Sequence, residues 1–128
     1  MEAILILAHG SKRNETEQTL NSIVQKVRNK IGSESVYPAY LQFSEQDMET
    51  IIKQLVDKGV KKFIVMPMFL FDGVHVTVDI PEEINKIKQK YSGIEIVITR
   101  HIGDDERIAD IIIDRIADFS GVVGGRKR

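Results

Sequence analysis

The sequences AILILAHGS at residues 3–11 and KFIVMPMFLFDGVH at residues 62–75 share one pattern. In each, a run of apolar residues passes into a turn that contains glycine and a histidine, His9 or His75. Short apolar runs rich in β-branched residues predict buried strands. Four such runs occur along the chain: Ala3 to Ala8, Val36 to Phe43, Lys62 to Phe71 and Ile94 to Thr99.

A helical pattern follows each predicted strand. In the first, Asn14 with Glu17 three positions later predicts a capping box, and Gly32 predicts the end of the helix. In the second, Ser44 with Asp47 predicts the amino-terminal cap.

The third and fourth helices have start signals of their own. Asp79 and Pro81 predict the start of the third helix, and the fourth runs from about Asp104 to Phe119. The fourth carries an apolar stripe at helical spacing, which we expect to face inward. Its members are Ile108, Ile111, Ile112, Ile116 and Phe119.

Strands that alternate with helices predict an α/β fold in which a four-stranded parallel sheet forms the middle of a three-layer sandwich. We expect the flavodoxin-like strand order 2-1-3-4, in a single domain over residues 1–120 followed by a flexible basic tail at residues 121–128. Ligands of such sheets bind beyond the carboxyl ends of the strands, at the switch point between the first and third strands.

The composition excludes several classes of function. The 128 residues carry 18 basic and 19 acidic side chains and no cysteine, which excludes disulfides and thiolate metal sites. The net charge of −1 provides no general attraction for nucleic acid or anionic membranes, so we expect neither partner. The amino terminus has neither the charge of a signal peptide nor a span long enough for a bilayer, so we expect a cytoplasmic protein.

Each of the three histidines directly follows a predicted strand. His9 and His75 follow neighbouring strands at the switch point, so their imidazoles can converge on one metal ion. His101 follows the strand one place further out and is expected at the rim. The alternative is that each histidine caps a loop or bonds to a backbone carbonyl.

The residues next to the histidines suggest a ligand. Ser11, Lys12 and Arg13 lie at the start of the first helix, where cations and free N–H groups form an anion site, although a solvated helix start looks the same. Phe71 and Val74 make the loop before His75 unusually apolar, which suits a flat aromatic ligand, a subunit contact or a buried turn.

Glu45 follows the second predicted strand at the same edge of the sheet. There its carboxylate can accept a proton or a hydrogen bond, or can simply favour the start of a helix.

Together, LAHGS at residues 7–11 and MPMFLFDGVHVTVDIP at residues 66–81 resemble the signatures of the short CbiX-type sirohydrochlorin chelatases, most closely the archaeal cobalt and nickel enzymes. FSE at residues 43–45, IGDD at residues 102–105 and Asp114-Arg115 extend the resemblance over nearly the whole chain. Two positions depart from it: Gln42 stands where a glutamate is expected, and Arg100-His101 replaces an acid followed by proline.

The resemblance implies a class II chelatase fold, a homodimer, and insertion of Co²⁺ or Ni²⁺ into sirohydrochlorin for cobalamin or coenzyme F430. It implies that His9 is proton acceptor and metal ligand and that His75 is the second ligand. Substrate contacts are implied for Glu45 and for the loop formed by Leu70, Phe71, Asp72, Gly73, Val74 and His75. The metal is then a substrate, and no tightly bound cofactor is expected.

Within this hypothesis, Lys12, Arg13 and Arg100 suit the carboxylates around the edge of sirohydrochlorin. Neutral imidazole binds Co²⁺ and Ni²⁺ and accepts protons near neutral pH. A protein that only carries metal remains an alternative, although it would not need the apolar loop. A histidine phosphatase is a second alternative, but Ala8 stands where that class has an arginine.

Overall fold

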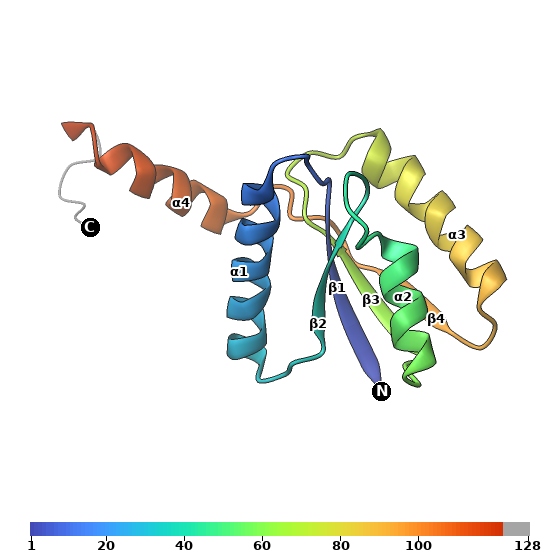
Figure 1. Cartoon of the computed structure of the whole chain (residues 1–128). Helices are drawn as coiled ribbons and strands as arrows, with labels where there is room; N and C mark the ends of the chain where they lie inside the picture. Colours follow the sequence, from blue (N-terminus) through green and yellow to red (C-terminus); the bar gives the residue numbers. More distant parts are fainter. Residues whose placement is uncertain (122–128) are drawn as a thin grey trace.

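The computed structural model describes residues 1–121, apart from the side chains of His75 and Val76. In this part of the chain, four parallel strands form one sheet in the order β2-β1-β3-β4 (Figure 1). The strands are β1 (Glu2–Ala8), β2 (Val36–Tyr40), β3 (Lys62–Pro67) and β4 (Glu95–Ile98). The predicted strand order is therefore confirmed.

The helices complete the predicted three layers. Helix α1 lies on one face of the sheet, and α2 and α3 lie on the other (Figure 1). Their bounds are α1 (Asn14–Ile31), α2 (Met48–Asp57), α3 (Ile80–Lys90) and α4 (Glu106–Ala117). A short π-helical turn, η1 (His75–Asp79), leads directly into α3 and was not expected from the sequence.

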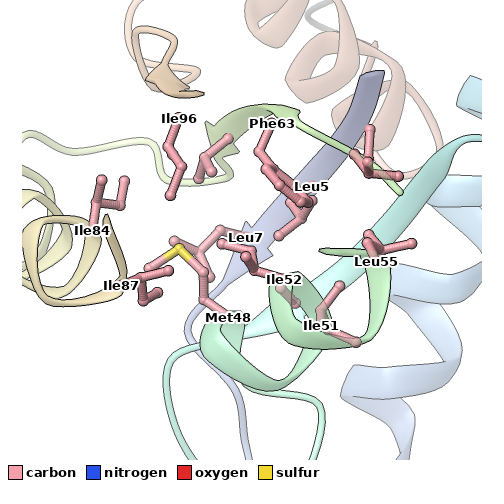
Figure 2. Close-up of a cluster of buried hydrophobic side chains, with 14 of the residues drawn as sticks. Leu5, Leu7, Met48, Ile51, Ile52, Leu55, Phe63, Ile84, Ile87 and Ile96 are labelled. Carbon is pink, nitrogen blue, oxygen red and sulfur yellow. The ribbon is translucent and has the colours of Figure 1, made fainter. Parts of the chain in front are cut away.

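The alternation of side chains along β1 divides the core. Leu5 and Leu7 point toward α2 and α3, where they pack with Phe63, Ile52 and Ile87 in the larger apolar cluster (Figure 2). Ile6 points the other way, into a smaller cluster under α1. The sheet is therefore well covered on its α2 and α3 face and more sparsely covered on the face of α1.

Three strands are shorter than predicted, and β4 loses only one residue at each end, since it runs from Glu95 to Ile98. β2 ends at Tyr40 rather than Phe43, because the chain turns away there and Phe43 adopts a positive φ of 60°. β3 ends at Pro67, so the apolar residues up to Phe71 form a loop. β2 is an edge strand, and Pro38 at its centre is paired with Ile6 of β1.

Helix capping differs in part from the prediction. The capping box at Asn14 is wrong, because Arg13 is the residue at the cap and makes no side-chain capping bond. Asp47 does cap α2, since its Oδ1 accepts a hydrogen bond of 2.8 Å from the backbone N–H of Thr50. Ser44 instead accepts a bond within the preceding turn.

The expectation that the apolar stripe of α4 faces inward is wrong for this chain taken alone. No residue of α4 is buried, and the helix projects from the body of the domain (Figure 1). Among the described residues, no helix is long and apolar enough to cross a membrane. The tail predicted at residues 121–128 lies outside the described residues, except for Gly121.

Candidate active site

His9 lies directly after β1, where three loops meet at the carboxyl edge of the sheet. The backbone N–H groups of Leu41 and Gln42 donate to the carbonyls of Ala8 and His9, at 3.0 and 3.2 Å. Gly10 follows with φ of 94°, and a Cβ atom at this position would lie 2.0 Å from the carbonyl oxygen of Gln42. Only glycine allows the loops after β1 and β2 to approach this closely.

The side chain of His9 lines a cavity of about 270 Å³ between β1, β2, α2 and the start of α3. The cavity carries three carboxylates as well as the imidazole. Its lining residues are His9, Tyr40, Leu41, Gln42, Asp47, Met48, Asp79 and Glu83. An imidazole surrounded by carboxylates is an arrangement that can attract a cation and accept protons.

The imidazole of His9 also contacts the loop after β3. Its ring meets the ring of Phe69 edge to face, with the centroids 6.0 Å apart and the planes at 89°. Met68 holds this loop in place, because its N–H donates to the carbonyl of Leu7 at 2.8 Å. His9 thus contacts the loop after β3 and also lines the cavity.

His75 is the first residue of η1, and its side chain lies outside the described part of the structure. Asp79, at the other end of η1, lines the cavity that contains His9. The backbone of η1 therefore runs from His75 to the edge of this cavity, while a metal site shared by His9 and His75 stays a prediction.

A group of exposed apolar side chains surrounds this edge of the sheet, and we call it the apolar rim. Its members are Phe43, Leu70, Phe71, Val74 and Val78, with exposed fractions of 53%, 48%, 82%, 66% and 44%. Asp72 and Gly73 of the same loop are exposed as well. The structure thus excludes a buried turn and leaves a broad apolar surface available to a ligand or a subunit.

The cations at the start of α1 lie on the outer side of this region. The ammonium of Lys12 lies over the ring of Phe43, 5.3 Å from its centroid, as in a cation–π contact. Arg13 pairs with Glu15 at 3.6 Å, with both side chains exposed. The hydroxyl of Ser11 accepts a hydrogen bond of 3.1 Å from the N–H of Arg13 and so shapes the turn.

Two of the predicted rim residues lie in other hollows. Glu45 lines a hollow of about 380 Å³ with Glu17, Phe43 and neighbours. His101 and Arg100 line one of about 440 Å³ beneath the start of α4. The structure therefore places neither Glu45 nor His101 in the cavity of His9.

The sequence analysis missed the carboxylates that share the cavity with His9. Asp79 and Glu83 lie at the start of α3, the helix that follows β3. They are four positions apart, and this spacing places both side chains on the same face of the helix, toward the cavity that they line. Asp47 was identified only as a helix cap. Within the described residues, no three histidine, aspartate or glutamate side chains are grouped closely enough to hold a metal ion, and the side chain of His75 is not among those residues.

Tyr40 lines the same cavity, but its side chain packs in the apolar cluster under α1. Its side chain is buried, and its hydroxyl has no hydrogen-bond partner among the described residues. Burial, together with the negative charge of Glu17, raises the pKa of this phenol. The hydroxyl therefore remains protonated at neutral pH.

Comparison with solved structures places this geometry among known proteins. A CbiX protein from Marinobacter aquaeolei VT8 superposes with a TM-score of 0.79 at 28% identity, over 92% of this chain and 96% of the other. The sirohydrochlorin chelatase SirB from Bacillus subtilis subspecies spizizenii, solved in complex with cobalt, gives a TM-score of 0.84 at 27% identity. That superposition covers 92% of this chain and 50% of the SirB chain.

The sequence relatives also include proteins of about the length of this chain and proteins of about twice its length. The sirohydrochlorin cobaltochelatase of Methanocaldococcus jannaschii is 30% identical over 90% of this chain and 97% of its own length. The chloroplastic sirohydrochlorin ferrochelatase of Arabidopsis thaliana is 33% identical over 90% of this chain, which spans only 51% of that relative. The family model of CbiX matches residues 3–119, and the chain belongs to the CbiX family.

Proposed function

We propose that this chain is a sirohydrochlorin chelatase that inserts Co²⁺ into the tetrapyrrole ring. The observation that carries the proposal is the position of His9 at the switch point of the sheet, where it lines a cavity with three carboxylates and contacts Phe69, the residue before the apolar rim residues Leu70 and Phe71. A chelatase needs both surfaces side by side, because a hydrated cation and a flat macrocycle must meet at one place.

The relatives support this reaction and this metal. The relative from Methanocaldococcus jannaschii, aligned over almost its entire length, is named a cobaltochelatase, and SirB has been solved both with cobalt and with Fe³⁺. Other relatives are named ferrochelatases, and this chain covers about half of their length. Nickel, with a product that feeds the synthesis of coenzyme F430, remains the alternative that the archaeal resemblance suggests.

In the proposed reaction, one divalent ion replaces two protons on the pyrrole nitrogens. His9 in its neutral form holds the ion through a ring nitrogen, and His75 is proposed as the second ligand. When the ion passes to the ring, the released imidazole of His9 accepts one of the two pyrrole protons, and the released imidazole of His75 is proposed to accept the other. Asp79 and Glu83 line the same cavity as His9.

The distribution of charge suits two substrates of opposite sign. Asp47, Asp79 and Glu83 make the cavity attractive to a cation, whereas Lys12 and Arg13 lie outside it at the start of α1. We propose that the cations bind the carboxylates at the edge of sirohydrochlorin while the ring rests on the apolar rim. Metal and macrocycle then approach His9 from different sides.

We further propose that the active unit is a homodimer. The apolar rim is open to solvent in a single copy, and one copy spans only half of the SirB structure that it matches. A second copy would supply the other half of a site that surrounds a broad macrocycle.

The experiment that tests this function measures initial rates of metal insertion into sirohydrochlorin with cobalt, nickel and iron. H9A and H75A are compared with H101A, a matched control because His101 belongs to the same edge of the sheet but lines a separate hollow. We expect cobalt to give the fastest rate, and H9A and H75A to lose at least about a hundredfold. H101A should stay close to the unsubstituted protein.

Full activity of H9A in a folded protein would contradict the role of His9. No insertion of any of the three metals by the unsubstituted chain would contradict the chelatase itself.

A further inference from the structure

Phe43, one of the residues of the apolar rim, adopts a backbone conformation that phenylalanine rarely takes. Its φ is 60°, in the left-handed region where a Cβ atom is crowded and glycine is not. At every other described position with positive φ, the residue is glycine. A bulky side chain in this region strains the backbone, and strain of this kind collects at functional sites. The chain therefore carries a phenylalanine where glycine would fit with less strain.

Hydrogen bonds on both sides of Phe43 hold this conformation. Before it, the N–H of Gln42 donates to the carbonyl of His9 at 3.2 Å. After it, the carbonyl of Gln46 accepts a hydrogen bond of 3.0 Å from the N–H of Tyr40, so the chain returns to the end of β2. The loop between these two bonds is short, and Phe43 lies in its middle. Its backbone is therefore held in place by the same loop that approaches His9.

The ring of Phe43 is not part of the core. It is 53% exposed, and among the described residues it packs with neither apolar cluster. Instead, the ammonium of Lys12 lies over its face, 5.3 Å from the centroid. Lys12 has no carboxylate within ion-pair distance in the part of the chain that the structure describes, whereas the neighbouring Arg13 pairs with Glu15. We call the exposed ring and its ammonium the Phe43–Lys12 pair.

The contact between the two side chains limits where the ammonium of Lys12 can lie. A lysine side chain is flexible, and its ammonium binds a carboxylate as a point charge, without the fixed geometry of a guanidinium. An ammonium held over an aromatic ring stays close to the surface that the ring offers. The Phe43–Lys12 pair thus presents an apolar face and a positive charge at one place. A flat ligand with carboxylates at its edge suits both, because it can pack on the ring and pair with the ammonium.

We propose that Phe43 is a positioning residue for the tetrapyrrole: its ring packs against the macrocycle and holds the ammonium of Lys12 beside a carboxylate of the same ligand. Glycine at this position would relieve the strain but would supply neither contact, which gives a physical reason for the phenylalanine. The proposal rests on the proposed chelatase function and adds a contact to it. Because this contact requires no metal, it can be measured by binding alone.

The test compares variants of the full-length protein that differ in the ring and in the backbone strain. F43Y keeps both, F43A removes the ring and keeps the strain, and F43G removes both. The Kd of metal-free sirohydrochlorin is measured for each by absorbance titration. We expect F43A and F43G to raise this Kd by a similar factor, at least about fivefold, and F43Y to change it by less than about twofold.

Stability should follow a different order from affinity. In urea, F43G should have a higher midpoint than F43A, because glycine relieves the strain at positive φ. The matched control is I31A, since Ile31 is 51% exposed but lies at the other end of α1 from Lys12. I31A should leave the Kd of sirohydrochlorin unchanged. Affinity that depends on the ring while stability depends on the strain is a result that a purely structural role of Phe43 would not produce.

A double-mutant cycle tests whether Phe43 acts through Lys12. K12Q should raise the Kd of sirohydrochlorin in the unsubstituted chain, because it removes the charge that pairs with a carboxylate. In the F43A background, the same substitution should raise the Kd by a smaller factor, because the ammonium is no longer held over a ring. Equal factors in the two backgrounds would show that Lys12 acts independently and would overturn the positioning role.

The other results are also distinct. If F43A and F43G bind sirohydrochlorin as tightly as the unsubstituted chain does, the role of Phe43 is overturned and the chelatase stands. If F43A loses affinity and F43G recovers it, the loss comes from strain, which likewise overturns the proposal. Variants that weaken a dimer seen by light scattering but leave the Kd of sirohydrochlorin unchanged would assign the ring to a second copy instead. An unsubstituted chain that binds no sirohydrochlorin would overturn this proposal and the chelatase together.

Discussion

Replacement of Gly10 by alanine tests whether the close approach of two loops positions His9. Alanine at φ of 94° is strained, which costs roughly 1–3 kcal/mol. Its Cβ would also lie 2.0 Å from the backbone oxygen of Gln42, so the loop after β2 must move. Overpacking of this kind costs roughly another 1–3 kcal/mol. We therefore expect G10A to lower the free energy of unfolding by about 2–6 kcal/mol.

Gly32 provides the matched control. It also has a positive φ, of 69°, but an added Cβ would meet nothing within 4 Å. G32A should therefore cost about 1 kcal/mol, from backbone strain alone. The difference between the two variants isolates the contact with Gln42, and urea denaturation of both measures it.

The same substitution should affect catalysis. Gln42 donates a hydrogen bond to the carbonyl of His9, so a displaced loop after β2 shifts the backbone of His9. A shift of about 1 Å in a catalytic group can cost on the order of a hundredfold in rate. The reasoning would be refuted if G10A and G32A lost equal stability and G10A kept the full rate of metal insertion.

Three further predictions concern single groups. Y40F should leave the free energy of unfolding unchanged or raise it by up to about 1 kcal/mol, because the lost hydroxyl is buried without a partner among the described residues; clear destabilisation in urea would reveal one. The guanidinium of Arg107 lowers the pKa of the Asp105 carboxyl through their hydrogen bonds. The pair therefore stabilises the start of α4 fully at pH values above the ordinary aspartate pKa of roughly 3.9. This contribution is lost as the pH falls through the lowered pKa. NMR titration of R107Q should show the pKa of Asp105 moving back up. Insertion should slow in acid because a protonated His9 neither binds metal nor accepts a proton, and excess cobalt should partly restore the rate; a flat rate profile from about pH 5 to 8 would contradict this role.

The strand order could be predicted because it depends on short apolar runs and on their alternation with helices. The glycine after β1 and the histidines after strands located the edge of the sheet where the candidate site lies. The pair Ser44 and Asp47 also located the start of the second helix, although Asp47 is the residue that caps it. These features are local, and local patterns in the sequence are sufficient to predict them.

Other features depend on contacts between distant segments. The cavity of His9 collects Asp79 and Glu83 from one helix and Tyr40 from a strand, and no spacing in the sequence joins these sets. The periodicity of α4 indicated a surface to be buried but not which surface would cover it. Phe43 could not be recognised as a turn residue, because a positive φ is rare for an aromatic side chain.

The proline in β2 has a consequence for solubility. The N–H of Ile4 donates to the carbonyl of Ser35, and the N–H of Leu41 donates to the carbonyl of Ala8. In a parallel pair, every second residue of a strand turns its N–H and C=O toward the partner, which here includes Ser35 and Leu41 of the chain around β2. Pro38 is one of the alternate residues, so its nitrogen points away from the sheet. The free edge of β2 therefore offers no N–H donor at its centre, and the outward N–H of Tyr40 is already bonded to Gln46 at 3.0 Å. An edge without free donors at its centre and at its carboxyl end is a poor template for another strand, so β2 resists the edge-to-edge pairing that leads to aggregation.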